Sequence, residues 1–170
     1  AGNETTRNAT TQGMWTLVEH PDAHRRLVAD PSALPRAIEE ILRWTTPVIH
    51  FRRTAMQDVE LRGKTIREGD KLALYYPSAN RDEEIFDDPQ TFKIDREPND
   101  HLSFGIGQHF CLGANLARME LGAIFREVLA RMPDLSLNGT PERLRSNFIH
   151  GVKRMPVRFT PERARARRRA

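Results

Sequence analysis

The sequence contains one cysteine and has no apolar run long enough to cross a membrane. A single cysteine excludes an internal disulfide, so nothing in the composition points to an oxidising compartment. No segment resembles a signal peptide or a membrane span. A hydrophobic share of 38% in 170 residues predicts one soluble globular domain, and the cytoplasm is the expected location.

The chain also lacks a charge excess outside its last nine residues. Residues 162–170 contain five arginines and one glutamate, and removing them from 27 basic and 23 acidic residues leaves 22 of each sign. The calculated pI of 9.7 is therefore mostly a property of this tail. We interpret the tail as a solvated, disordered end and expect no nucleic-acid partner.

The apolar periodicity predicts a mainly α fold with small antiparallel β-sheets. Helical spacing starts at the first residue without a cap or an initiating Met, so we expect the chain to begin inside a helix of a longer protein. Short alternating runs from 48 to 74 and around 148–159 predict strands. The expected helices cover residues 1–18, 20–31, 35–46 and 114–132.

A long segment at 77–103, rich in Asp, Asn and Pro, has no regular apolar pattern. It is predicted to be an ordered loop with one helical turn. Since a loop of this length needs something to hold it, we interpret a cofactor as a good candidate.

The cysteine lies in the segment FGIGQHFCLG, directly before the last predicted helix. A cysteine that ligates haem iron must present a thiolate close to the porphyrin in a dry site. Gly105 and Gly107 let the backbone approach a ring, Gly113 allows tight packing, and the helix that follows places N–H dipoles near Cys111. A buried structural cysteine and a phosphate-binding glycine loop are the alternatives, although the Gly-Lys-Ser/Thr of a P-loop is absent.

This segment matches, position for position, the haem-binding signature of the cytochrome P450 superfamily, and the chain resembles the C-terminal part of that fold. The resemblance implies that Cys111 is the axial ligand of a haem b iron. It also implies that Phe104 packs over the sulfur side of the ring, beside Gly105 and Gly113, and that His109 reaches a haem propionate. Family members are longer, so residues 1–161 are expected to be part of a single P450 domain, followed by the tail at 162–170.

Other motifs of the family follow in the expected order. Glu40 and Arg43 form the ExxR pair, which shares one helix face and can make a bidentate ion pair. On its own such a pair is more often a solvated surface contact, but the flanking apolar residues favour burial. The resemblance implies that Arg96 completes the network.

The first five residues, AGNET, resemble the family's distal-helix pattern, which implies that Glu4 and Thr5 relay protons to bound dioxygen. Arg53 resembles the propionate-binding arginine of the family, and His101 resembles a second propionate partner. For His101, a loop-capping role is the alternative.

The resemblance implies a haem-thiolate monooxygenase that inserts one oxygen atom from O2 into a small lipophilic substrate, with the isolated chain inactive. The framework segments resemble the bacterial, actinobacterial-type branch that hydroxylates sterol side chains, branched lipids and terpenoids. Electrons are expected from a ferredoxin and ferredoxin reductase, with docking at Arg118, Arg126 and Arg131. The pocket is expected to include Val48, Ile49, His50, Phe148 and Ile149.

Two other functions remain open from the residues alone. A haem-free relic would use the apolar stripe of the last helix as an interaction surface. A redox-sensing protein would expose Cys111 as a reactive thiol.

Overall fold

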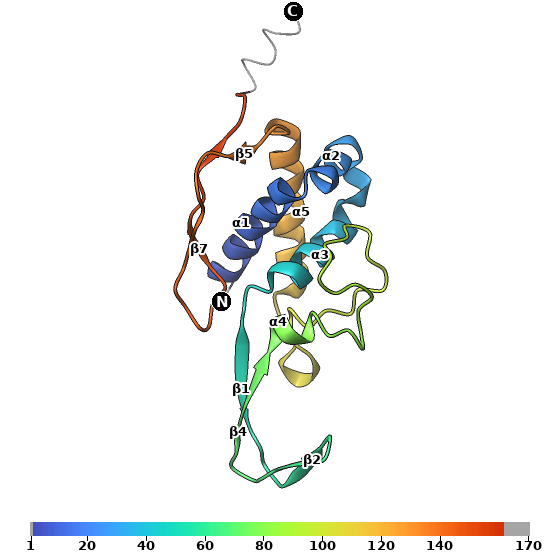
Figure 1. Ribbon diagram of the computed structural model, residues 1–170, viewed down its shortest axis with the longest axis vertical. Helices are drawn as coiled ribbons and strands as arrows, with labels where there is room; N and C mark the ends of the chain where they lie inside the picture. Colours follow the sequence, from blue (N-terminus) through green and yellow to red (C-terminus); the bar gives the residue numbers. More distant parts are fainter. Residues whose placement is uncertain (1, 162–170) are drawn as a thin grey trace, which may run out of the picture.

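The computed structural model describes residues 2–161, and its elements follow the predicted order (Figure 1). The predicted fold class is confirmed, while the tail at 162–170 and Ala1 lie outside the described residues. The α-helices are α1 (Glu4–Glu19), α2 (Pro21–Ala29), α3 (Leu34–Thr45), α4 (Tyr76–Ala79) and α5 (Ala114–Arg131), and 3-10 turns η1 and η2 cover Pro31–Ala33 and Gly107–His109. The strands are β1 (His50–Thr54), β2 (Val59–Leu61), β3 (Lys64–Ile66), β4 (Lys71–Tyr75), β5 (Ser136–Leu137), β6 (Glu142–Arg143), β7 (Val152–Arg154) and β8 (Val157–Arg158).

The core lies where α1, α3 and α5 pack against one another (Figure 1). The apolar face of α3 is fully used, since its alanine, isoleucines and leucines inside the helix are all buried. Gly13 of α1 makes this packing possible. A Cβ atom added there would lie 2.7 Å from both the Ile41 and the Phe125 side chains, so only glycine allows the three helices to approach this closely.

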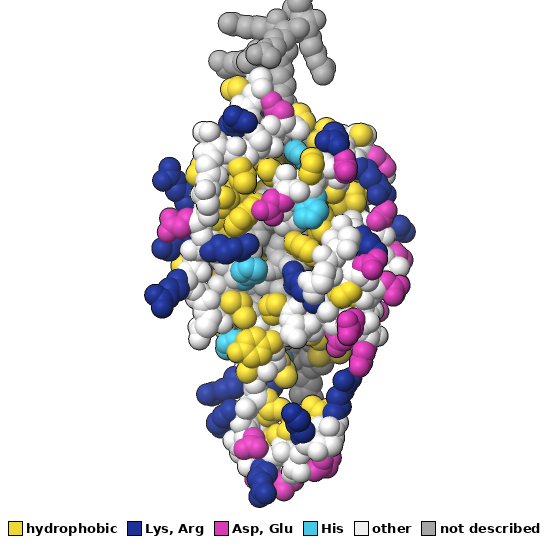
Figure 2. Space-filling view, viewed as in Figure 1, with side chains coloured by type: hydrophobic (Ala, Val, Ile, Leu, Met, Phe, Trp, Pro, Cys, Tyr) yellow, Lys and Arg dark blue, Asp and Glu magenta, His cyan; other side chains and the backbone are white. Residues whose placement is uncertain are grey.

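Four two-stranded antiparallel sheets complete the structure. The β2–β3 hairpin is inserted between β1 and β4, and the whole ribbon extends away from the helices (Figure 1). Arg62 and Gly63 both have positive φ at the β2–β3 turn, which is the geometry of a two-residue hairpin loop. Hydrophobic side chains gather where this ribbon meets the helical part of the molecule (Figure 2). The C-terminal strands run beside α1, so the last part of the chain returns to its first helix.

Only part of the wide apolar stripe expected on α5 is buried in the core. Leu121, Phe125 and Leu129 are buried, whereas Leu116 and Met119 are 59% and 70% exposed. The buried residues face α1 and α3, while the exposed ones lie on the other side of the stripe. Within residues 2–161, none of the helices combines the length and apolar character needed to cross a bilayer.

Candidate functional site

The centre of the molecule holds a buried ion pair on α3. Glu40 and Arg43 lie one helical turn apart, and both side chains have no exposed surface. The Arg43 Nε and Nη2 donate to the two Glu40 carboxylate oxygens at 2.7 and 2.8 Å. This bidentate geometry is the strong form of a charge-assisted hydrogen bond. The predicted contact is therefore present, and it is buried rather than on the surface.

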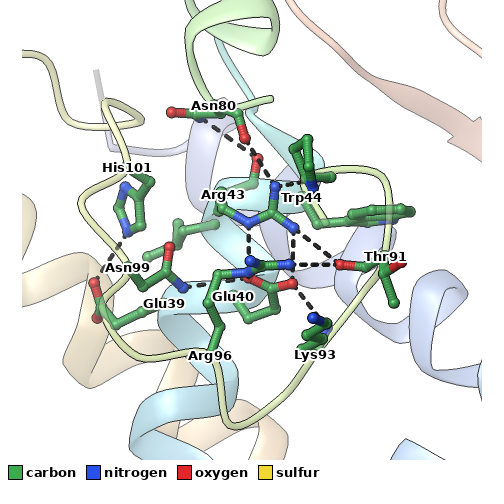
Figure 3. Close-up of polar contacts among 12 residues, drawn as sticks. Glu39, Glu40, Arg43, Trp44, Asn80, Thr91, Lys93, Arg96, Asn99 and His101 are labelled. Atoms are coloured by element: carbon green, nitrogen blue, oxygen red, sulfur yellow. Dashed lines mark hydrogen bonds and ion pairs between the residues drawn. The ribbon is translucent and has the colours of Figure 1, made fainter. Parts of the chain in front are cut away.

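Arg96 brings a second guanidinium to the same carboxylate. Its Nε donates to Glu40 Oε2 at 3.0 Å, and its side chain is 4% exposed (Figure 3). The backbone N–H of Lys93 and the side-chain amide of Asn99 also donate to Glu40. The Glu40 carboxylate thus accepts hydrogen bonds from Arg43 on α3 and from three residues of the loop between α4 and η2. The contact with Arg96 is the one that the family resemblance implied.

The two arginines hold the long loop between α4 and η2 in place. Arg43 Nη1 donates to the carbonyl oxygens of Asn80 and Pro89 at 2.8 and 2.9 Å. Arg96 donates to the carbonyl oxygens of Asp87, Asp88 and Thr91. The interpretation of a cofactor as the anchor of this loop was wrong, because buried guanidinium groups of the chain itself satisfy its backbone.

Sequence reasoning missed Asn80, a fully buried side chain in the same network. Its Oδ1 accepts from the Leu102 N–H at 2.7 Å, and its Nδ2 donates to the hydroxyls of Thr46 and Ser103 at 2.9 Å. Asn80 thereby joins the end of α3 to the segment that leads to Cys111. One asparagine among many polar loop residues carries no pattern that marks it as buried.

Sequence reasoning also missed Glu39. This residue links α3 to α5 and to residues 101–113, the segment that carries Cys111 and is called the cysteine loop. Its carboxylate accepts two hydrogen bonds from Arg118 at 2.7 and 2.8 Å and one from His101 at 3.1 Å. Burial opposes ionisation of Glu39, but the hydrogen bonds from His101 and Arg118 and the Arg118 charge outweigh it and lower the pKa to about 2. The Arg118 guanidinium also lies 4.6 Å from the centroid of the Phe104 ring.

The cysteine loop ends in an open apolar surface. Cys111 is a free, exposed thiol, and its backbone N–H donates to the Phe104 carbonyl at 2.9 Å. Around it Ile106 and Phe110 are largely exposed, and Leu112 is completely exposed. Solvent-exposed apolar groups of this size, gathered around one thiol, indicate a surface that an apolar body covers.

The residues present fit the haem that the sequence implies. Gly105 and Gly107 have φ of 74° and 72°, and no atom lies within 4 Å of a Cβ added at Gly107. The backbone at Gly107 is therefore open for close approach by a flat ring. The Cys111 thiolate is the donor that a haem iron would need, and the exposed apolar side chains beside it suit the apolar ring. Exposure of Cys111 by itself also suits a redox-sensing thiol.

The residues predicted to bind propionates differ in their surroundings. The His109 side chain is exposed in η2, and Arg53 is half-buried on β1, where its Nη1 donates to the Arg52 carbonyl. His101 is different, because its side chain is 3% exposed and its ring contacts Glu39 and the Ser103 N–H. The geometry favours the loop-capping role for His101, so we correct its assignment as a propionate partner.

Glu4 and Thr5 lie in the first turn of α1. The Glu4 carboxylate is exposed and accepts a hydrogen bond from Arg7 at 2.5 Å, while Thr5 is half-buried. Their role as a proton relay stays a prediction.

The structure brings the predicted pocket residues together from two distant segments. Val48 and Ile149 form an antiparallel bridge, and the Ile49 N–H donates to the Phe148 carbonyl at 2.9 Å. The His50 and Phe148 rings lie 6.2 Å apart. The two predicted halves of the pocket are therefore neighbours in the fold, and their role as a pocket stays a prediction.

Comparisons with known proteins identify the family of this chain. The family model described as "Cytochrome P450" matches residues 32–147, which is more than half of the chain. The "Methyl-branched lipid omega-hydroxylase" of Mycobacterium tuberculosis is 52% identical over 162 residues, which cover 94% of this chain and 38% of the relative. The "Steroid C26-monooxygenase" of Mycolicibacterium smegmatis is 48% identical, with coverage of 94% and 37%.

Solved structures agree with these sequence relatives. CYP109E1 from Bacillus megaterium, solved in complex with testosterone, superposes with a TM-score of 0.92 at 40% identity and covers 94% of this chain and 45% of its own. Mycobacterium marinum CYP268A2, solved in complex with pseudoionone, has a TM-score of 0.89 at 44% identity, with coverage of 93% and 38%. The chain thus spans less than two fifths of the length of the curated relatives it matches.

Proposed function

This chain belongs to the cytochrome P450 family, and we propose that residues 1–161 are the iron-ligating part of a single haem-thiolate monooxygenase domain. The observation that carries the proposal is the exposed Cys111 thiol at the end of a glycine-lined loop, surrounded by exposed apolar side chains. Family members hold haem through a cysteine thiolate. The network of Glu40, Arg43 and Arg96 would hold in place the segment that leads to this loop.

Each residue of the site has a defined task in this proposal. Cys111 would ligate the haem iron, and Phe104, whose ring lies against the Arg118 guanidinium, would pack on the sulfur side. Arg53 and His109 would pair with the haem propionates through charge-assisted hydrogen bonds. Gly105 and Gly113 would let the backbone come close to the haem.

The chemistry that bound haem supplies is reductive activation of dioxygen, driven by electron donation from the thiolate. Within this chain, Glu4 and Thr5 in the first turn of α1 are the proposed groups that hold and pass protons to the distal side. An acid next to a hydroxyl can both accept and donate a proton, which is what such a relay requires.

We infer a lipophilic substrate of the sterol, branched-lipid or terpenoid class. Two of the relatives are named for the hydroxylation of methyl-branched lipids and of steroids. The wall formed by Val48, Ile49, Phe148 and Ile149 is apolar, with His50 as its polar member. The site and the length of the chain support the proposal that activity needs the longer protein.

A ferredoxin with its reductase is the proposed electron source. Arg126 is exposed on α5 and provides positive charge for an acidic partner. Arg118 contributes less to such a surface than the sequence suggested, because Glu39 binds it in bidentate fashion. The cytoplasmic location stays a prediction.

Reduced difference spectra with carbon monoxide test the haem proposal. The chain is supplied with haem, and Cys111→Ser is compared with the unchanged sequence. A thiolate-type Soret band that is lost in the variant supports the proposal, while an identical spectrum in both contradicts it. Absence of any haem spectrum, both in this chain and in a longer protein that carries the N-terminal part, would favour the haem-free interaction module. Monooxygenase turnover by the 170-residue chain alone would contradict its proposed inactivity.

A further inference from the structure

A polar cluster forms where the C-terminal hairpin returns to α1. Arg143 of β6 lies between the two elements, with its guanidinium carbon 4.4 Å from the Trp15 ring centroid. Its Nη1 contacts Gln12 Oε1 at 3.2 Å and His150 Nε2 at 2.9 Å. The Gln12 side chain in turn donates to the His150 carbonyl at 2.5 Å. These residues belong to none of the P450 motifs identified in the sequence.

The hydrogen bonds of His150 define its protonation state. Its Nδ1 lies 2.7 Å from the Thr45 carbonyl, which can only accept, so Nδ1 carries a hydrogen. Its Nε2 faces a guanidinium, which can only donate, so Nε2 must be the acceptor. The arrangement is complete only when the imidazole is neutral, and a second proton would break the contact with Arg143.

This histidine is joined directly to the pocket wall. Phe148 and Ile149 precede it in the chain, and its own N–H donates to the Pro47 carbonyl at 2.9 Å. Two residues further along, the Val152 N–H donates to Asn8 Oδ1 at 3.1 Å. The position of the wall relative to α1 and to the end of α3 therefore depends on the bonds made by residues 150–152.

We propose that Arg143 and His150 are positioning residues that hold Phe148 and Ile149 in the substrate pocket, and that they do so only while His150 is neutral. The inference rests on the proposed function, because it concerns the same pocket. Acidification would protonate His150, loosen this wall and weaken the binding of a lipophilic ligand.

The charges around His150 agree with this inference. Burial lowers the pKa of His150, the hydrogen bond to the Thr45 carbonyl raises it, and the positive charges of Arg143 and Arg81 lower it further. The α1 residue that contacts His150 is the uncharged Gln12, and the α3 group that contacts its ring is the Thr45 backbone carbonyl. Since the unfolded chain binds this proton more tightly, the neutral contact is complete above the ordinary value of 6.5 and is lost as the pH falls toward the lowered pKa.

Amide hydrogen exchange on the full chain, supplied with haem, tests the positioning role. In Arg143→Gln, protection factors of residues 148–152 should fall about fivefold at neutral pH, the effect of losing one ordinary hydrogen bond. Arg145→Gln, which changes an exposed arginine in the same hairpin, is the matched control and should leave them unchanged. Equal protection in the two variants would overturn the inference.

The pH profile separates positioning from a general loss of stability. In the unchanged chain, protection at 148–152 should fall as the pH is lowered below 6.5, whereas His150→Gln should show no such dependence. A profile that persists in His150→Gln would overturn the inference, and this variant also serves if Arg143→Gln does not fold.

Binding of testosterone, a lipophilic probe that carries no charge at any pH used, links the cluster to the pocket. Its affinity should follow the same pH profile and fall about threefold to tenfold in Arg143→Gln. If testosterone binds no variant at any pH, the proposed steroid-binding wall of this chain fails, the carbon monoxide spectrum still tests the haem proposal, and the exchange profile still decides the positioning role. If testosterone binds with the same affinity at every pH and in Arg143→Gln, the positioning inference fails and the proposed function stands.

Discussion

The two ends of the segment that follows α4 contrast sharply. At the Glu40 network every charged group finds its partner inside the chain, and the Arg43 and Arg96 side chains are almost completely buried. At the cysteine loop, the open end of the segment, Cys111 and Leu112 are exposed to solvent. Their apolar neighbours Ile106 and Phe110 are also largely uncovered by residues 2–161. The charged groups of this network are therefore paired within the chain, whereas the exposed apolar groups around the thiol call for an apolar partner from outside. This difference is what a scaffold built to receive haem requires.

The largest effect on stability is expected when the negative charge of Glu40 is removed from the buried network, the closed end of this segment. Glu40→Gln leaves Arg43 and Arg96 buried side by side without a counter-charge, which we expect to cost about 3 to 5 kcal/mol of unfolding free energy. Urea denaturation followed by circular dichroism measures this loss. The long loop should also become sensitive to proteolysis, because both arginines anchor its carbonyl groups.

Glu84→Gln is the matched control for that change. It removes the same charge from an ion pair with Arg62 in which both side chains are mostly exposed. Exposed pairs contribute about 0 to 1 kcal/mol, so this variant should unfold almost as the unchanged chain does. Similar losses in both variants would contradict the importance of burial at Glu40.

A smaller effect is expected at Glu39, which lies between the closed and the open end. Its pKa falls from 4.5 to about 2 in the folded chain, so its contribution to stability is present above pH 4.5 and is lost as the pH falls toward 2. Glu39→Gln should therefore cost about 1 to 2 kcal/mol at neutral pH, allowing for solvent screening, and almost nothing near pH 2. Urea unfolding across this pH range measures the difference.

Glu127→Gln, at an exposed position of α5, provides the comparison for the acid range. If the stability difference between Glu39→Gln and the unchanged chain stays constant from pH 4.5 to 2, the contacts with His101 and Arg118 do not lower the pKa of Glu39. The same titration reports on the cysteine loop, because Arg118 also contacts the Phe104 ring.

The sequence was most informative where residues interact within one element. The i, i+3 spacing of Glu40 and Arg43 and the apolar face of α3 predicted the buried pair and its helix. The partners of Glu39 and Asn80 lie 22 to 79 residues away, and such contacts leave no periodic signal. These long-range contacts depend on how the whole chain folds, which no single residue specifies.

Predictions about exposure were weaker for a related reason. The periodicity predicted a wide apolar stripe on α5 but not which of its residues are covered, because periodicity records which residues share a face and not what packs against that face. Leu116 and Met119 show that part of this face has no partner among residues 2–161. The role of His101 was transferred from a motif, while its position next to Glu39 depends on the tertiary fold.

The smallest effect on chain stability is expected at the open end, where Leu112→Asn should change the unfolding free energy of the haem-free chain by less than about 0.5 kcal/mol. Leu112 is fully exposed, so its apolar surface stabilises nothing within the chain. With haem present its burial is worth roughly 1.5 to 3 kcal/mol, so haem affinity measured by absorbance titration should fall about tenfold or more. Met56→Asn, at another exposed apolar residue in the turn after β1, should change neither quantity. A loss of stability without haem, or an unchanged haem affinity, would mean that Leu112 serves the chain itself and that the open end is not a haem surface.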